Sequence, residues 1–74
     1  MNPTNFEWAL RELKEGKKLT RRGWNGPDQW IALQIPDENS KMTLPYIYIS
    51  TVGGCLVPWI ASQGDLLADD WALV

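Results

Sequence analysis

The chain opens with an apolar stripe of helical period. Four hydrophobic residues recur at the three- and four-residue spacing that places side chains on one helix face: Phe6, Ala9, Leu10 and Leu13. Thr4 is placed to act as the N-cap with Glu7 as its capping-box partner, and Gly16 is a typical C-terminal stop. These signals predict an amphipathic helix over residues 5–15.

After this helix the pattern changes to a period of two, which is typical of half-buried β-strands. Residues 18–22 are expected to form a short strand with Leu19 facing inward. Residues 29–35 alternate between two sets, Ile31, Leu33 and Ile35 on one face and Trp30, Ala32 and Gln34 on the other. Residues 46–51 alternate in the same way, with Ile47 and Ile49 opposite Tyr46 and Tyr48.

Turn-forming residues separate these strands. Gly, Asn and Pro cluster in residues 23–28, and residues 36–45 form a polar loop. Residues 52–55 are expected to be a hairpin turn that leads into a strand over residues 55–59. Because Pro58 cannot donate a ladder hydrogen bond, this strand should end there or lie at a sheet edge.

The C-terminal part contains a second capping signal. Ser62 and Asp65 predict a short helix over residues 63–68, and residues 71–74 can form a brief final strand. The expected fold is α+β. One N-terminal helix packs on a small, mostly antiparallel sheet, with a short second helix near the C-terminus, and residues 1–74 form one domain.

The size of the chain predicts association. A chain of 74 residues buries only about 60% of the surface that its unfolded form exposes, so its core is marginal. Cys55 is the one cysteine, so an internal disulfide is excluded, as suits a reducing cytosol. We therefore expect a self-associating cytoplasmic protein.

Charge is unevenly distributed along the chain. The net charge of −2 argues against a protein that coats DNA or RNA. Five of the seven basic residues nevertheless gather in one short stretch: Lys14, Lys17, Lys18, Arg21 and Arg22. Such a cluster can simply complement the helix dipole and stay solvated, or an arginine within it can bind a phosphate bidentately.

Several chemistries lack the residues they need. The chain has no histidine and no phosphate-binding or dinucleotide-binding glycine pattern. Asp65, Asp69 and Asp70 could hold a hard cation, but their spacing matches no calcium loop, and a solvated helix face is the favoured interpretation. No apolar run is long enough to span a bilayer. We expect a protein that is not an enzyme and needs no metal or cofactor. A weak nucleotide hydrolase is a lesser alternative.

Five tryptophans in so short a chain require an explanation. Trp8 and Trp30 are interpreted as core or interface residues, and Trp71 as a packing residue that pins the final strand. Trp24 lies in a turn flanked by glycines, where its ring needs a cover. A ligand or a neighbouring subunit could cover it, and the same two alternatives apply to Trp59.

Two motifs resemble a known family. Residues 22–26 read Arg-Gly-Trp-Asn-Gly, and residues 57–71 contain Pro-Trp-x-Ala-Ser-Gln-x-Asp followed by Leu-Ala-x-Asp-Trp. With the preceding helix and lysine-rich turn, this order resembles the small phage and bacterial domain of the second Thoeris anti-defence family. The resemblance covers nearly the whole chain, although residues 36–54 form a shorter middle region than other members have.

The resemblance implies a non-enzymatic sponge. Such proteins form homotetramers and sequester a cyclic ADP-ribose isomer, glycocyclic ADP-ribose, which is the signal of a Thoeris immune sensor. Some relatives also look able to hold cyclic di- or oligonucleotides at a separate site. Carried over to this chain, the resemblance gives Trp24, Asn25, Trp59, Ser62, Gln63 and Asp65 as pocket residues. Arg21 or Arg22 would offset phosphate charge.

A rival hypothesis comes from a different class of protein. The same tryptophans could anchor a protein-interaction or structural oligomerisation module that binds no small molecule. The two hypotheses differ in what removing Trp24 or Trp59 does. A sponge loses its ligand, whereas an interaction module loses its assembly or its partner.

Overall fold

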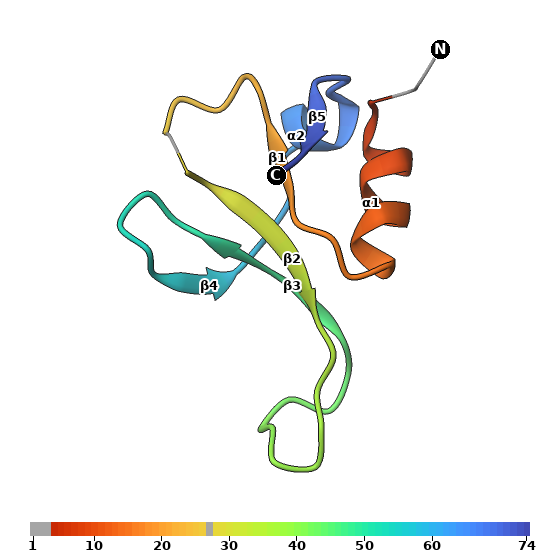
Figure 1. Cartoon of the computed structure of the whole chain (residues 1–74), viewed down its shortest axis with the longest axis vertical. Helices are drawn as coiled ribbons and strands as arrows, with labels where there is room; N and C mark the ends of the chain where they lie inside the picture. Colours follow the sequence, from red (N-terminus) through yellow and green to blue (C-terminus); the bar gives the residue numbers. More distant parts are fainter. Residues whose placement is uncertain (1–3, 27) are drawn as a thin grey trace.

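The structure is a computed structural model that describes residues 4–26 and 28–74. It confirms the α+β fold (Figure 1). In chain order the elements are α1 (Phe6–Lys14), β1 (Leu19–Arg21), β2 (Trp30–Gln34), β3 (Tyr46–Ser50), β4 (Leu56–Pro58), α2 (Gln63–Leu67) and β5 (Trp71–Leu73). Each predicted element exists, and no bound differs from the prediction by more than one residue.

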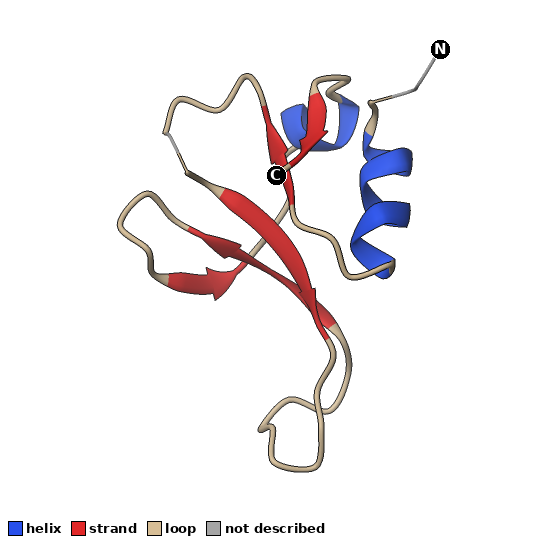
Figure 2. Ribbon diagram, viewed as in Figure 1, coloured by secondary structure: helices blue, strands red, loops and turns tan. Residues whose placement is uncertain are grey.

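The five strands form one sheet in the order β4-β3-β2-β1-β5, and every adjacent pair is antiparallel. Helix α1 packs against β1, β2, β5 and α2, so both helices lie beside the same end of the sheet (Figure 2). The loop between β2 and β3 extends away from the helices, at the far end of the molecule (Figure 1). The predicted polar loop over residues 36–45 is confirmed.

The start of α1 corrects one prediction. Asn5, not Thr4, is the N-cap, and its side chain accepts a hydrogen bond from the backbone N–H of Trp8 at 3.0 Å. Thr4 is used elsewhere, because its hydroxyl donates to the carbonyl of Asp69 and its own carbonyl accepts from the N–H of Trp71. The sequence contains two adjacent capping residues, and the packing of β5 against the helix start decides between them.

The end of α1 follows the prediction. Gly16 has a φ of 90°, the left-handed conformation that glycine adopts most readily. The N–H of Gly16 donates to the carbonyl of Leu13, and the N–H of Lys17 donates to that of Glu12. This pair of bonds is the Schellman arrangement that closes a helix.

The core is small and lies between α1 and the sheet. Its fully buried members are Ala9, Leu13, Leu19, Ile31 and Trp71. Leu19 faces inward as predicted, and Phe6 and Leu10 pack against this cluster, as the predicted helix face requires. Burial of one such large side chain stabilises the fold by roughly 1.5–3 kcal/mol, so few residues carry most of the stability.

Strand β2 shows where simple alternation fails. Ile35 lies beyond the strand and is 62% exposed, so the predicted strand over residues 29–35 is one residue too long at this end. Ala32 belongs to the opposite face from Ile31 and is nevertheless buried. Its side chain is small, and its cross-strand partner is Tyr48.

The predicted hairpin between β3 and β4 is confirmed. The N–H of Thr51 donates to the carbonyl of Cys55 at 2.9 Å, and Gly54 adopts a φ of 86° inside the turn. Strand β4 pairs only with β3 and forms one edge of the sheet, as Pro58 predicted. Helix α2 begins with a full capping box between Ser62 and Asp65.

Candidate functional site

Trp71 is the centre of the region that contains the two motifs. Its side chain is fully buried, which confirms the predicted packing role. Three aromatic rings surround it, with centroid distances of 5.4 Å to Phe6, 5.4 Å to Trp24 and 6.0 Å to Trp59. Trp24 and Trp59 both meet Trp71 edge to face, at 78° and 88°. The tryptophans of the two distant motifs therefore share one buried neighbour.

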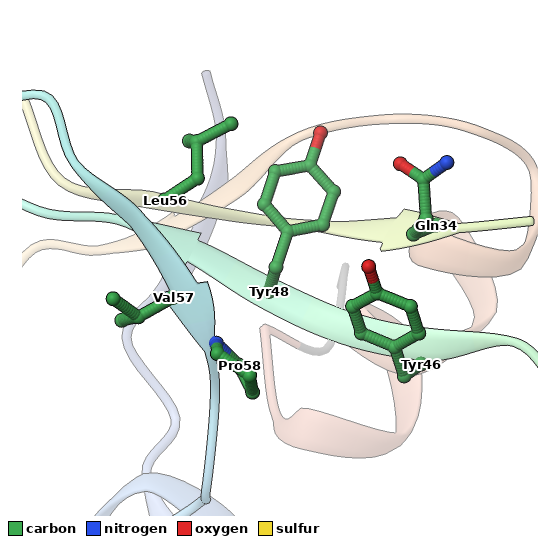
Figure 3. A pocket seen from close by; sticks show the side chains of 6 residues that line it. All are labelled: Gln34, Tyr46, Tyr48, Leu56, Val57 and Pro58. Atoms are coloured by element: carbon green, nitrogen blue, oxygen red, sulfur yellow. The ribbon is translucent and has the colours of Figure 1, made fainter. Parts of the chain in front are cut away.

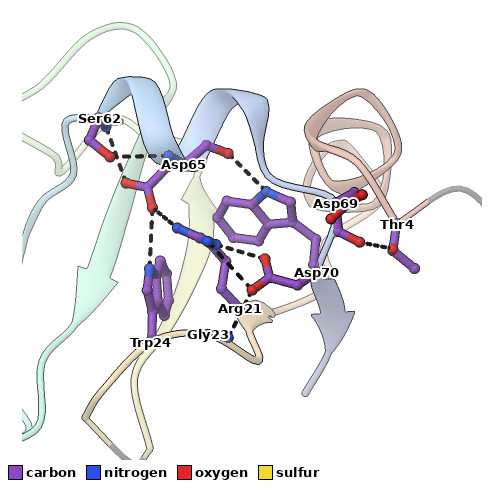
Figure 4. A network of polar contacts seen from close by, with 9 residues as sticks. Thr4, Arg21, Gly23, Trp24, Ser62, Asp65, Asp69 and Asp70 are labelled. Atoms are coloured by element: carbon purple, nitrogen blue, oxygen red, sulfur yellow. Dashed lines mark hydrogen bonds and ion pairs between the residues drawn. The ribbon is translucent and has the colours of Figure 1, made fainter.

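Asp65 joins the same region through hydrogen bonds (Figure 4). Its Oδ1 accepts from Trp24 Nε1 at 3.2 Å, and its Oδ2 accepts from the N–H of Ser62 at 3.1 Å. Its backbone carbonyl accepts from Trp71 Nε1 at 3.0 Å. Asp65 is only 8% exposed, so these bonds replace the water that the carboxylate loses.

Arg21 completes this network from β1. Its Nη1 donates to Asp65 Oδ1 at 2.8 Å, and its Nε donates to Asp70 Oδ1 at the same distance. The other oxygen of Asp70 accepts from the N–H of Gly23 at 2.8 Å. A Cβ at Gly23 would approach that oxygen to 2.6 Å, so a side chain there would force the turn away from Asp70. Arg21 thus ties β1 to α2 and to the start of β5 (Figure 4).

The network changes the interpretation of the acidic residues. Asp65 is buried and Asp70 is half-buried, and both pair with Arg21, so the predicted solvated face is wrong for these two. Asp69 is exposed, as predicted. Among residues 4–26 and 28–74, no group of three His, Cys, Asp or Glu side chains could hold a metal ion.

The ion pairs shift the pKa values of their members. The hydrogen bond from Arg21 lowers the pKa of Asp70 below its usual value, and the two carboxylates raise the pKa of Arg21. Burial by itself would raise the pKa of Asp65, but hydrogen bonds from Arg21, Ser62 and Trp24 outweigh it and leave this pKa lowered. All three side chains are therefore charged near neutral pH.

A loss of stability in acid follows from these shifts. A carboxyl whose pKa is lower in the folded protein stabilises the fold above its unfolded pKa, about 3.9, and loses that contribution as pH falls through the folded value. We expect the free energy of unfolding to be constant from about pH 7 to pH 5 and to fall below about pH 4. Urea titrations at several pH values measure this, and Asp70→Asn should lessen the dependence.

The remaining candidates are more accessible. Arg22, Asn25, Ser62 and Gln63 are exposed, and Trp59 is half-buried. Ser62 uses its hydroxyl oxygen to accept from the N–H of Asp65 at 3.1 Å. In the described part of the chain the Arg22 side chain forms no ion pair, in contrast to that of Arg21. The structure thus separates the ion-paired residues, half-buried Arg21 and buried Asp65, from more accessible candidates around them.

Two hollows lie apart from these residues. One, of about 160 Å³, is lined by Gln34, Tyr46, Tyr48, Leu56, Val57 and Pro58 (Figure 3). The other, of about 460 Å³, is lined by Met42, Thr43, Leu44, Pro45, Tyr46 and Pro58. None of the eight predicted site residues lines either hollow. Strand alternation already placed Tyr46 and Tyr48 on one face, but no motif marked them as functional.

The comparison with known proteins identifies the family. A model of the Thoeris anti-defense 2-like domain matches residues 4–74 and so contains both motifs. The chain belongs to this family. The resemblance predicted from the two motifs is confirmed, and the family name describes an anti-defence role against the Thoeris system.

A curated member of the Thoeris anti-defence family is similar over almost its full length. Thoeris anti-defense 2 of Bacillus phage SP01 is 31% identical over 83 residues, which cover 95% of this chain and 93% of that protein. The aligned stretch is longer than the 74 residues of this chain, so the phage protein has residues without a counterpart here. In the present chain, no helix among the described residues is long and apolar enough to cross a membrane.

Proposed function

We propose that this protein is a non-enzymatic sponge that sequesters a cyclic nucleotide signal of Thoeris immunity. The signal is a cyclic ADP-ribose isomer of the glycocyclic type, and cyclic oligonucleotides are further candidate ligands. Sequestration in the host cytoplasm keeps the signal from its effector. The proposal rests on family membership and on the convergence of Trp24 and Trp59 at Trp71.

The half-buried tryptophans and the exposed polar candidates suit a nucleotide-type ligand. The indole faces of Trp24 and Trp59 can stack on a base, and one such contact contributes on the order of 1–3 kcal/mol. Asn25 and Gln63 are exposed amides that can both donate and accept hydrogen bonds. Arg22 is an exposed guanidinium that can offset phosphate charge.

Self-association, as a homotetramer, is part of the proposal. In the described residues, twelve large hydrophobic side chains are exposed while six hydrophobic residues are buried, which is a large uncovered apolar surface for so small a domain. Two of these lie close in sequence to candidate residues: Ile60, which is 90% exposed, follows Trp59, and Leu67, which is 81% exposed, lies two residues after Asp65. A second copy that covers them would also help to enclose a ligand, since the eight predicted residues line neither of the two hollows described above.

Sequestration requires affinity and not turnover. Stacking and hydrogen bonding are sufficient for that task, and excluding water at a subunit junction strengthens them. Denaturation of the complex should therefore release an unaltered ligand. A hydrolase would release products instead.

The test is to replace the two candidate indoles, both half-buried, one at a time. We expect Trp59→Ala and Trp24→Phe each to weaken binding of glycocyclic ADP-ribose by about tenfold or more. Trp59→Ala removes a stacking ring, and Trp24→Phe replaces the indole by a smaller ring without its N–H. Isothermal titration calorimetry measures the affinity, and size-exclusion chromatography with light scattering measures the assembly.

The control is Trp30→Ala, which removes a half-buried indole outside the two motifs. Equal affinities for the parent, Trp24→Phe and Trp59→Ala proteins, all folded and assembled, would contradict the proposed site. A parent protein that binds no ligand, together with dissociation of the assembly in Trp24→Phe or Trp59→Ala, would favour the interaction module.

A further inference from the structure

The two adjacent arginines of the basic cluster differ in what they contact. Arg21 is half-buried, and its guanidinium donates to Asp65 and to Asp70, each at 2.8 Å. A third contact, from Nη2 to Asp70 Oδ2, is 3.4 Å long. Arg21 therefore faces two carboxylates of its own chain, which already balance its charge.

The carboxylates bound by Arg21 are bound in turn to the two motifs. Asp65 Oδ1 accepts both from Arg21 Nη1 and from Trp24 Nε1, so one oxygen sets the position of the indole relative to the guanidinium. Asp70 Oδ2 accepts from the N–H of Gly23, which precedes Trp24 in the chain. Trp24 is thus fixed twice, through its ring nitrogen and through the backbone of its turn.

We propose that Arg21 is a positioning residue that fixes Trp24 and the start of α2 through Asp65 and Asp70, and that it does not contact the ligand. The inference rests on the proposed function for its effect on ligand affinity. Arg21 is suited to this task because its planar fork can engage two carboxylates at once, which a lysine ammonium does with less directionality.

Asp70 gives the decisive variant, because it is outside the predicted pocket residues. Asp70→Asn keeps the size of the side chain and weakens its bonds to Arg21 and Gly23. If Arg21 bound the ligand directly, loosening its internal pair would leave ligand affinity unchanged or raise it. If Arg21 positions Trp24, the same change must lower ligand affinity, although the predicted pocket residues and the Arg21 guanidinium are all unchanged.

The experiment measures affinity and the state of the Trp24 indole in the same samples. Glycocyclic ADP-ribose is titrated into parent, Asp70→Asn, Arg21→Lys and Arg11→Lys proteins at a temperature where denaturation curves show all of them folded. Arg11→Lys is the matched control, because Arg11 pairs with Glu7 on the exposed surface of α1. The Trp24 Nε1–H resonance is assigned with Trp24→Phe and followed by proton–nitrogen correlation spectra.

We expect affinity to fall about tenfold in Asp70→Asn and in Arg21→Lys, as the loss of a charge-assisted hydrogen bond suggests. The Trp24 indole resonance should move in both, whereas Arg11→Lys should match the parent in both measurements. Parent-like or tighter binding by Asp70→Asn would overturn the positioning role.

Failure of the proposed function gives a different result. If the parent binds neither glycocyclic ADP-ribose nor a cyclic dinucleotide, the sponge proposal is wrong. The Trp24 indole resonance then tests only whether Arg21, Asp65 and Asp70 fix the position of Trp24. A Trp24 resonance that moves in Asp70→Asn supports the positioning of Trp24 by Arg21 and its partners, and one that stays in place overturns it.

Discussion

Trp71→Ala should lose most of the stability of the fold. Trp71 is fully buried, contacts Phe6, Trp24 and Trp59, and donates its indole N–H to the carbonyl of Asp65. Truncation of a buried tryptophan costs about 3–5 kcal/mol, and natural domains have only about 5–15 kcal/mol in total. We expect a protein that is largely unfolded at 37 °C, as circular dichroism and urea titration would show.

Trp71→Phe separates the two contributions of this side chain. It keeps an aromatic ring in the core but removes the donor to Asp65, so its loss of stability should be intermediate. Trp30→Ala is the control for removal of an indole, because Trp30 is only half-buried and contacts Tyr48 and Lys18 instead. An ordinary point mutation changes the free energy of unfolding by about 1 kcal/mol. A Trp71→Ala protein whose free energy of unfolding differs from that of the parent by no more than this would contradict the central place of Trp71 in the core.

Asp65→Ala should have the second largest effect. It removes the acceptor of Arg21, of Trp24 Nε1 and of the Ser62 N–H in one step, and it leaves the Arg21 guanidinium with Asp70 as its remaining partner. Breaking one side of a buried ion pair costs about 3–5 kcal/mol, and because Asp70 still balances the charge of Arg21 the loss here should lie toward the lower end of that range. Asp65→Asn retains an oxygen acceptor and should lose less.

Asp69→Asn is the matched control for this experiment. Asp69 is exposed and its interaction with Thr4 uses the backbone carbonyl, which the substitution leaves in place. The free energy of unfolding of the Asp69→Asn protein should stay within about 0.5 kcal/mol of that of the parent. Urea titrations of the three variants at pH 7 measure the differences, and equal stability of Asp65→Ala and Asp69→Asn would contradict a structural role for the network.

Local signals predicted most of the fold. The helical stripe of Phe6, Ala9, Leu10 and Leu13, the capping box at Ser62 and the glycines at turns each depend on neighbouring residues, which the sequence shows directly. The two errors have different sources, one a distant contact and the other a strand end. Asn5 replaces Thr4 as N-cap because β5 engages Thr4, and Ile35 is exposed because β2 ends before it.

The candidate site was harder to predict. The two tryptophan motifs could be recognised, but the pairing of Arg21 with Asp65 and Asp70 joins residues 44 and 49 positions apart. Charge type alone suggested a phosphate partner for Arg21 and solvent for the aspartates. Only the antiparallel pairing of β1 with β5, which places Arg21 opposite Trp71, brings these charges together.

Native mass spectrometry of the purified protein with glycocyclic ADP-ribose and a set of cyclic dinucleotides tests the sponge proposal most directly. We expect a tetramer that gains whole ligand masses and releases the ligand unchanged on denaturation. An assembly that takes up none of these compounds would contradict a sponge for this class of signal and favour an interaction module. Release of cleaved products would contradict sequestration and favour a hydrolase.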